Sequence, residues 1–319
     1  MNRAVVGYAL LVAALLIAPA AGAYPFFLMK VLCFALFASA FNLLLGFAGL
    51  LSLGHAAFFG TAGYVAGYAL KDLGLTPELG ILLATASSAL LGFVVGGLAI
   101  RRRGIYFAMV TLALAQMIYF FCVQAKFTGA EDGLHGIPRG ALFGLLSLES
   151  DLAMYYVVVA VYVGGMFLIY RTVHSPFGQV LKGIRENEPR VRSLGYDVER
   201  FKLLAIVLSA ALSGLAGGTK AVALGFETLI DVHWHMSGEV VLMTLIGGVG
   251  TLLGPSVGAA LVVGMESTLA DKVGSWVTVI MGALFMLCVL AFRRGIVGEL
   301  ASLFRMRETA VQEIAEEKA

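Results

Sequence analysis

The segment from Arg171 to Lys202, RTVHSPFGQVLKGIRENEPRVRSLGYDVERFK, is the only long charged stretch in a chain that is otherwise strongly apolar. It holds seven basic and four acidic residues, and an apolar run long enough to span a bilayer flanks it on each side. Because basic residues concentrate in cytoplasmic loops, the segment is predicted to lie in the cytoplasm. It is therefore the part of the chain best placed to contact a soluble partner.

A short helix is specified locally inside this segment. Asn187 is a good N-cap, Pro189 suits a first helical turn, and Gly195 fits the left-handed position just past a helix C-terminus. We therefore expect a helix from Glu188 to Leu194. A short capped helix on a cytoplasmic loop is typical of a docking element.

The composition predicts an all-α, polytopic transmembrane bundle. The chain has 319 residues, of which 60% are hydrophobic and 13% are charged, against roughly 45–50% and 25% in soluble domains. Lipid offers no hydrogen bonds to exposed backbone, and the apolar runs are continuous, which favours helices over a barrel. With a net charge of +2 and basic residues segregated by side, no nucleic-acid surface is predicted.

Ten candidate spans follow from the apolar runs, and they cover residues 4–23, 27–47, 50–70, 79–100, 104–124, 152–170, 202–224, 238–252, 254–271 and 275–292. With both termini inside, sixteen of the 22 Lys and Arg residues lie on the inner side, which predicts an N-in, C-in orientation. The membrane domain is expected over 1–307 and a polar tail over 308–319. The first run also resembles a secretory signal ending at Ala23, but its length favours an uncleaved span.

Glycine is abundant, with 39 residues in the chain, and it forms clusters at 46–67 and 247–264. Pairs such as Gly92/Gly96 and Gly214/Gly218 have the small-xxx-small spacing that lets helix backbones approach closely. Both clusters predict broken or tightly packed helices. The similarity of their sequences also predicts an internal repeat.

Nucleotide-binding and zinc-protease motifs are missing from the sequence: there is no GxxxxGK[ST] and no HExxH. The three cysteines, Cys33, Cys122 and Cys288, match no disulfide or metal spacing, and the pair His233 and His235 is best explained as interfacial polar residues. No metal or cofactor is predicted, and an enzyme is not expected.

Polar residues inside the predicted spans are candidates for a substrate path, because each must be satisfied within the bundle or face water. The candidates are Asn42, Ser52, His55, Gln116 and Glu239. His55 follows Gly54 in a glycine-rich span, where a broken helix would offer free backbone groups to a zwitterion. Structural hydrogen bonds inside the bundle, or a solvated position for Glu239, explain the same residues equally well.

Four motifs carry a resemblance to the LivM-type permease subunit of branched-chain amino acid ABC importers. They are FNLLLGFAGLLSLGHAAFFGTAGY from Phe41, DGLHGIPR from Asp132, SPFGQVLKGIRENEPRVRSLGYDVERFKLLAIVLSAALSGLAGG from Ser175 and EVVLMTLIGGVGTLLGPSVGAAL from Glu239. The resemblance implies a half-transporter in a bacterial inner membrane, paired with a sister permease, two ATPase subunits and a periplasmic solute-binding protein.

The resemblance also implies roles for two loops. The residues expected to couple to the ATPase are Arg185, Glu186, Asn187, Glu188, Pro189, Arg190, Arg192, Leu194 and Gly195. Those expected to contact the binding protein are Asp132, Gly133, Gly136, Pro138 and Arg139. Arg190 and Val191 depart from the family pattern, which usually has two small residues there.

Two other functions stay open on the sequence alone. The same scaffold serves urea, amides or aromatic acids, and selection is expected to begin at the separate binding protein. An ion-coupled secondary transporter would need paired carboxylates within the membrane, and it would leave the capped cytoplasmic helix unexplained.

Overall fold

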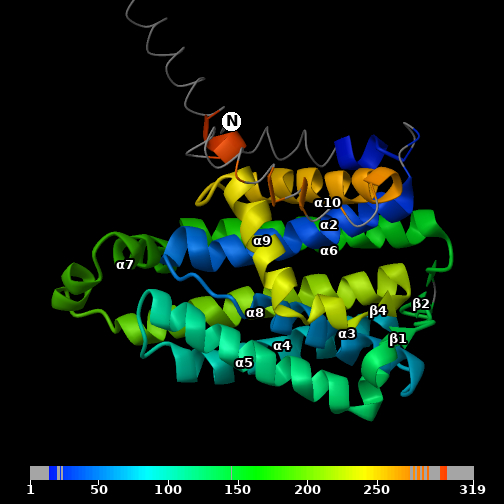
Figure 1. The fold of residues 1–319 in the computed structure, drawn as a ribbon, viewed down its shortest axis with the longest axis horizontal. Helices are drawn as coiled ribbons and strands as arrows, with labels where there is room; N and C mark the ends of the chain where they lie inside the picture. The colour runs from blue at the N-terminus through cyan, green and yellow to red at the C-terminus, as the bar shows by residue number, and fades with distance from the viewer. Residues whose placement is uncertain are drawn as a thin grey trace, which may run out of the picture.

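The computed structural model describes residues 24–144 and 146–273, together with 14–19, 22, 276, 279–280, 282–283, 286 and 295–299. The described chain is a bundle of long helices with two small two-stranded sheets (Figure 1). The helices are α2 (Pro25–Asn42), α3 (His55–Lys71), α4 (Pro77–Ala99), α5 (Ile105–Gln124), α6 (Asp151–His174), α7 (Pro176–Ser193), α8 (Val198–Leu224), α9 (Trp234–Gly247) and α10 (Gly254–Val273). The short elements are η1 (Leu43–Phe47), η2 (Lys126–Thr128), η3 (Ala130–Asp132), η4 (Leu229–Asp231), β1 (Leu134–His135), β2 (Ala141–Leu142), β3 (Leu146–Ser147) and β4 (Phe226–Glu227).

Among the described residues, five helices are long and apolar enough to cross a bilayer: α2 with its π-helical extension η1, α4, α5, α6 and α8. They confirm five of the predicted spans, although α6 and α8 begin or end several residues beyond the predicted bounds. Each helix satisfies its own backbone hydrogen bonds, which is the condition for entering lipid. The chain is therefore an all-α, multi-pass membrane protein.

The remaining predicted spans differ from the structure in their details. Helix α3 starts at His55 and not at 50: residues 49–54 are not helical, and Gly49 has a φ of +72°. Helix α9 has 14 residues, which at about 1.5 Å per residue is shorter than a bilayer core of about 30 Å. Both glycine clusters thus interrupt helices, since residues 248–253 likewise separate α9 from α10.

Two predicted spans, 4–23 and 275–292, and the polar tail 308–319 fall largely or wholly outside the described residues. The total of ten spans and the N-in, C-in orientation therefore stay predictions. So does the proposed internal repeat.

The structure brings the loops predicted on each side of the membrane to opposite ends of the bundle. At one end, Arg103 in the α4–α5 turn pairs with Glu188 of α7. At the other end, β1 pairs with β4 in an antiparallel sheet, and Figure 1 shows these strands far from α7. This agrees with the predicted alternation of loops, while the assignment of the α7 end to the cytoplasm rests on its positive charge.

Glycine residues, which have no side chain, let α3, α4 and α8 pack closely. A Cβ atom added to Gly92 of α4 would collide with Ala210 of α8, and one added to Gly217 of α8 would collide with the backbone of Phe59 in α3. In lipid, helices associate largely through such close packing, because there is little hydrophobic force between them. The glycine spacing seen in the sequence therefore corresponds to real helix contacts.

Gly217→Ala is expected to destabilise the protein by about 1–3 kcal/mol, because the new methyl group meets a backbone oxygen that belongs to a packed helix. Gly97→Ala in α4 is the matched control, since a Cβ there meets nothing within 4 Å. Thermal unfolding in detergent measures both. Equal melting temperatures for the two variants would contradict the packing argument.

Candidate coupling and transport sites

Helix α7, in the middle of the charged segment, consists of two helices and not of the single short helix that was predicted. Within α7, Asn187 has non-helical angles (φ −155°, ψ 88°), so the helix divides there. The Asn187 Oδ1 atom accepts a hydrogen bond from the backbone N–H of Arg190 at 3.1 Å, and Gly195 has a φ of +89°. The short capped helix predicted from Glu188 to Leu194 is therefore present, but it ends at Ser193 with Leu194 as its C-cap. Its contact with an ATPase stays a prediction.

The first half of α7 was not predicted. Its start has clear local signals, because Ser175 is the N-cap, its hydroxyl accepts from the N–H of Gly178, and Pro176 occupies the first turn. Leu181 and Ile184 are buried on one face of this helix and belong to a cluster with Leu44 of η1. This half of α7 is thus packed against the end of the bundle.

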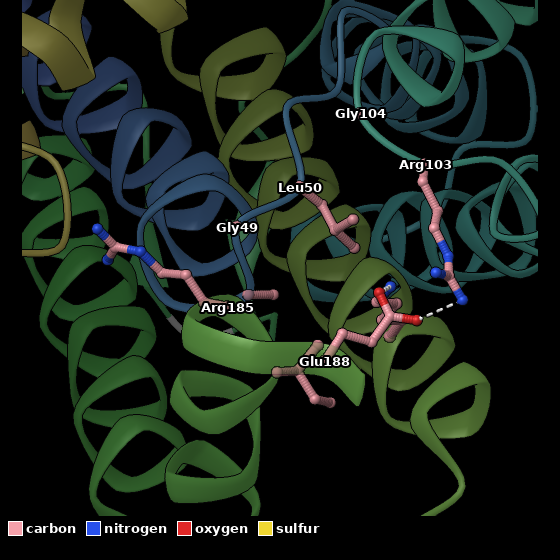
Figure 2. Close-up of a pocket in the computed structure, with 9 residues that line it drawn as sticks. Gly49, Leu50, Arg103, Gly104, Arg185 and Glu188 are labelled. Atoms are coloured by element: carbon pink, nitrogen blue, oxygen red, sulfur yellow. Dashed lines mark hydrogen bonds and ion pairs between the residues drawn. The ribbon is translucent and has the colours of Figure 1, made fainter. Parts of the chain in front are cut away.

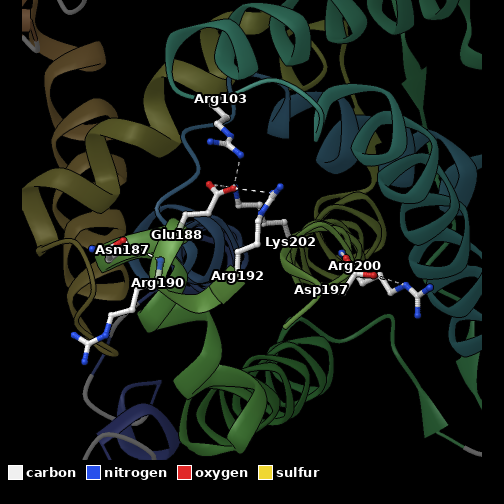
Figure 3. Close-up of polar contacts among 8 residues, drawn as sticks. All are labelled: Arg103, Asn187, Glu188, Arg190, Arg192, Asp197, Arg200 and Lys202. Carbon is white, nitrogen blue, oxygen red and sulfur yellow. Dashed lines mark hydrogen bonds and ion pairs between the residues drawn. The ribbon is translucent and has the colours of Figure 1, made fainter. Parts of the chain in front are cut away.

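Glu188 is the centre of an ion-pair cluster (Figure 3). Its carboxylate lies 2.7 Å from Lys202 Nζ, 3.0 Å from Arg103 Nη2 and 3.4 Å from Arg192 Nη2. Burial acts to raise the pKa of Glu188, but the hydrogen bond from Lys202 and the three positive charges together lower it below its ordinary value. The cluster joins the short helix to α8 and to the α4–α5 turn.

Arg185 makes a second connection, from α7 to η1. Its guanidinium donates to the backbone oxygen of Gly46 in η1, and Figure 2 shows this side chain directed away from Glu188. Nearby, Asn42 donates to the Thr251 oxygen at 2.8 Å and accepts from the Gly250 N–H at 2.9 Å. A continuous set of contacts therefore runs from α7 through η1 to the α9–α10 loop.

The surface of the predicted coupling segment is open. Of its nine named residues, Glu188 is half-buried and the other eight are exposed. Leu194 is 69% exposed and the neighbouring Tyr196 is 45% exposed, so the helix presents apolar groups beside its charges. Val191, one of the two departures from the family pattern, is buried inside the chain, whereas Arg190 is exposed.

The predicted path residues differ in how far they are buried. Asn42, Ser52 and His55 are buried, and Gln116 and Glu239 are half-buried. His55 Nε2 lies 2.8 Å from Ser209 Oγ, which donates to the Ala40 oxygen; Nε2 is therefore assigned as the donor to Ser209. Their role in a substrate path stays a prediction.

The loop that holds the predicted binding-protein contacts is partly bonded to the bundle. Arg139 donates to the Ala223 oxygen at 2.9 Å and pairs with Asp151 at 2.6 Å, and Gly133 is buried against Glu227. Asp132, Gly136 and Pro138 remain exposed. These three are therefore the predicted binding-protein contacts that the described structure leaves accessible.

A buried ionic cluster at the same end was not predicted from the sequence. Lys220 Nζ lies 2.6 Å from Asp231 Oδ1 and 3.2 Å from Glu227 Oε2, and all three residues are at most 5% exposed. Burial raises the pKa of Glu227 well above its ordinary value, although Lys220 acts in the opposite direction. The available signal was a lysine within an apolar run.

The other expectations on site chemistry concern cysteines and metals. Cys33 and Cys122 are buried free thiols, and Cys288 lies outside the described residues. Among the residues that the structure describes, no group of three His, Cys, Asp or Glu side chains is arranged to hold a metal ion.

Known proteins resemble the chain over most of its length. A family profile described as the permease component of branched-chain amino acid transport systems matches residues 23–290. The high-affinity branched-chain amino acid transport permease LivM of Salmonella typhimurium is 29% identical over 253 residues, which is 72% of this chain and 60% of LivM. LivM of Escherichia coli is 28% identical with the same coverage.

A third relative carries a different name. The autoinducer 2 import system permease LsrC of Klebsiella pneumoniae is 27% identical over 215 residues, which is 65% of this chain and 59% of LsrC. The chain thus matches about 60% of the length of these relatives. No solved structure matches it significantly.

Proposed function

Since the chain belongs to the branched-chain amino acid transport permease family, we propose that it forms half of the translocation path of a bacterial inner-membrane ABC importer. The substrate is a branched-chain or related amino acid. A sister permease, two ATPase subunits and a periplasmic solute-binding protein complete the transporter. The family match over residues 23–290 is the observation that carries this proposal.

The described contacts suggest how such a subunit works. The helix from Glu188 to Leu194 docks on an ATPase subunit, and closure of the ATPase pair moves it. Glu188 passes this movement to α8 through Lys202, and Arg185 passes it to the broken helix at Gly46. At the far end, the loaded binding protein docks on the exposed residues of the Asp132–Arg139 loop.

A second candidate function has the same architecture and another solute, such as urea, a short amide or an aromatic acid. The similarity to LsrC favours keeping it, because that relative is named for the import of a molecule that is not an amino acid. The two candidates differ in cargo and not in mechanism.

Reconstitution tests the proposal. The chain is purified with the permease, ATPases and binding protein encoded beside its gene and placed in vesicles. We expect ATP-dependent uptake of leucine, isoleucine or valine that requires the binding protein. Uptake by the chain alone would contradict the proposal, and uptake of another solute only would select the second candidate.

His55→Ala is expected to reduce uptake severalfold while leaving ATPase binding unchanged, if His55 lies on the path. Because His55 is bonded to Ser209, Ser209→Ala is the control that removes the same hydrogen bond and keeps the imidazole. Uptake and pull-down of the ATPase are measured for both. An equal loss in the two variants would return His55 to a structural role.

A further inference from the structure

A cavity with a volume of about 250 Å³ lies beside the residues predicted to couple to the ATPase, at the α7 end of the bundle. Its lining comes from the loop after η1, the α4–α5 turn, α7 and the start of α8, as Figure 2 shows in part. The residues that decide its chemistry are Arg103, Gly104, Glu188 and Lys202. This volume is well above what one water molecule needs, so a phosphate group with its four oxygens has room.

The charge around this cavity is not balanced. Its charged lining residues are Arg103, Arg185, Lys202 and Glu188, so three positive charges and one negative charge leave an excess of two. The Lys202 side chain is only 6% exposed, whereas that of Arg103 is 63% exposed. The cavity wall therefore combines a buried cation with one that reaches solvent, and both can bond to an anion.

The start of α5 adds hydrogen-bond donors to the same wall. Gly104 is the N-cap and has a φ of +57°, and no side chain caps this helix. The N–H groups of the first helical turn have no carbonyl partner within the helix and favour negative charge. They support the cationic lining but do not define the site alone.

The outer surface next to the cavity is apolar. Ile105, Tyr106 and Met109 follow Gly104 on α5, and they are 75%, 71% and 60% exposed. In a membrane-spanning helix such side chains face lipid chains, and an aromatic ring at this level suits the interface. A ligand with a phosphate at the cavity and hydrocarbon along α5 therefore matches both surfaces.

We propose that this cavity binds the phosphate of an anionic phospholipid from the leaflet at the α7 end, with its acyl chains along the start of α5. Basic pockets between the ends of transmembrane helices suit such headgroups. The lipid would bridge α5, α8 and the coupling segment. The proposal concerns lipid binding by the chain and does not depend on the identity of the transported solute.

Native mass spectrometry of the purified full chain, without ATPase subunits or nucleotide, tests the site. The probes are phosphatidylglycerol and phosphatidylethanolamine with identical acyl chains. We expect tighter binding of phosphatidylglycerol, weakened about fivefold by Arg103→Gln and largely retained by Arg103→Lys. Arg200→Gln is the matched control, because Arg200 is 82% exposed and pairs with Asp197, away from the cavity lining. Glu188→Gln is expected to strengthen binding, since it removes the competing carboxylate.

Three results would overturn the proposal. The first is equal binding of the two lipids, and the second is an equal loss in Arg103→Gln and Arg200→Gln, which would indicate diffuse attraction. The third is an Arg103-dependent thermal stabilisation by inorganic phosphate that equals the one by phosphatidylglycerol, which would assign the cavity to a soluble anion. Melting curves of each variant show whether it is folded. Because transport is not measured, failure here leaves the proposed function standing.

Discussion

Lys220→Met is expected to destabilise the protein by about 3–5 kcal/mol, because it leaves two buried carboxyl groups without their ammonium partner. The Glu227 Oε1 atom already has no hydrogen-bond partner among the described residues, so it cannot compensate. Gly63 of α3 lies against the same carboxylate, so the unpaired carboxyl group would stand directly against a packed helix. Thermal unfolding and the yield of monodisperse protein measure the effect.

Two further variants separate loss of the ion pair from loss of a lysine. Lys126→Met is the control for charge, because Lys126 is exposed at the same end of the molecule. Combining Lys220→Met with Glu227→Gln and Asp231→Asn removes all the charges together and is expected to recover part of the stability. Equal melting temperatures for Lys220→Met and Lys126→Met would show that the cluster contributes nothing.

Gly195→Val is expected to lower uptake about tenfold relative to ATP hydrolysis in the reconstituted transporter. Gly195 has a φ of +89°, and a β-branched residue in left-handed backbone costs about 1–2 kcal/mol or more. No neighbouring atom lies within 4 Å of an added Cβ, so the strain falls on the end of the short helix and not on the core. The ratio of solute imported to ATP hydrolysed is the measurement.

A matched control uses Gly164→Val in α6, where a Cβ also meets nothing within 4 Å and the backbone is helical. Arg192→Glu tests the same helix by charge, because it places a second carboxylate beside Glu188. Both Gly195→Val and Arg192→Glu should insert into the membrane normally. An unchanged ratio in both would count against docking of the ATPase on this helix.

The sequence was sufficient to predict those elements that depend on residues close together along the chain. Lipid forces long apolar runs into helices, so five spans were predictable within a few residues. The short helix followed from Asn187 and Gly195, because an N-cap and a left-handed glycine act within one or two turns. The predicted span 238–252 begins and ends later than helix α9 (Trp234–Gly247), since an apolar run does not show where a helix stops near glycine.

The sequence by itself determined the membrane class, the family resemblance and the capped helix. Composition and helix capping depend only on which residues are present and on their order over a few positions. Tertiary structure alone decided that Glu188 holds three cations and that Arg185 reaches Gly46. It also decided that Lys220 is buried with Glu227 and Asp231. Charges on different helices meet only when packing sets their distances, and no spacing along the chain encodes that.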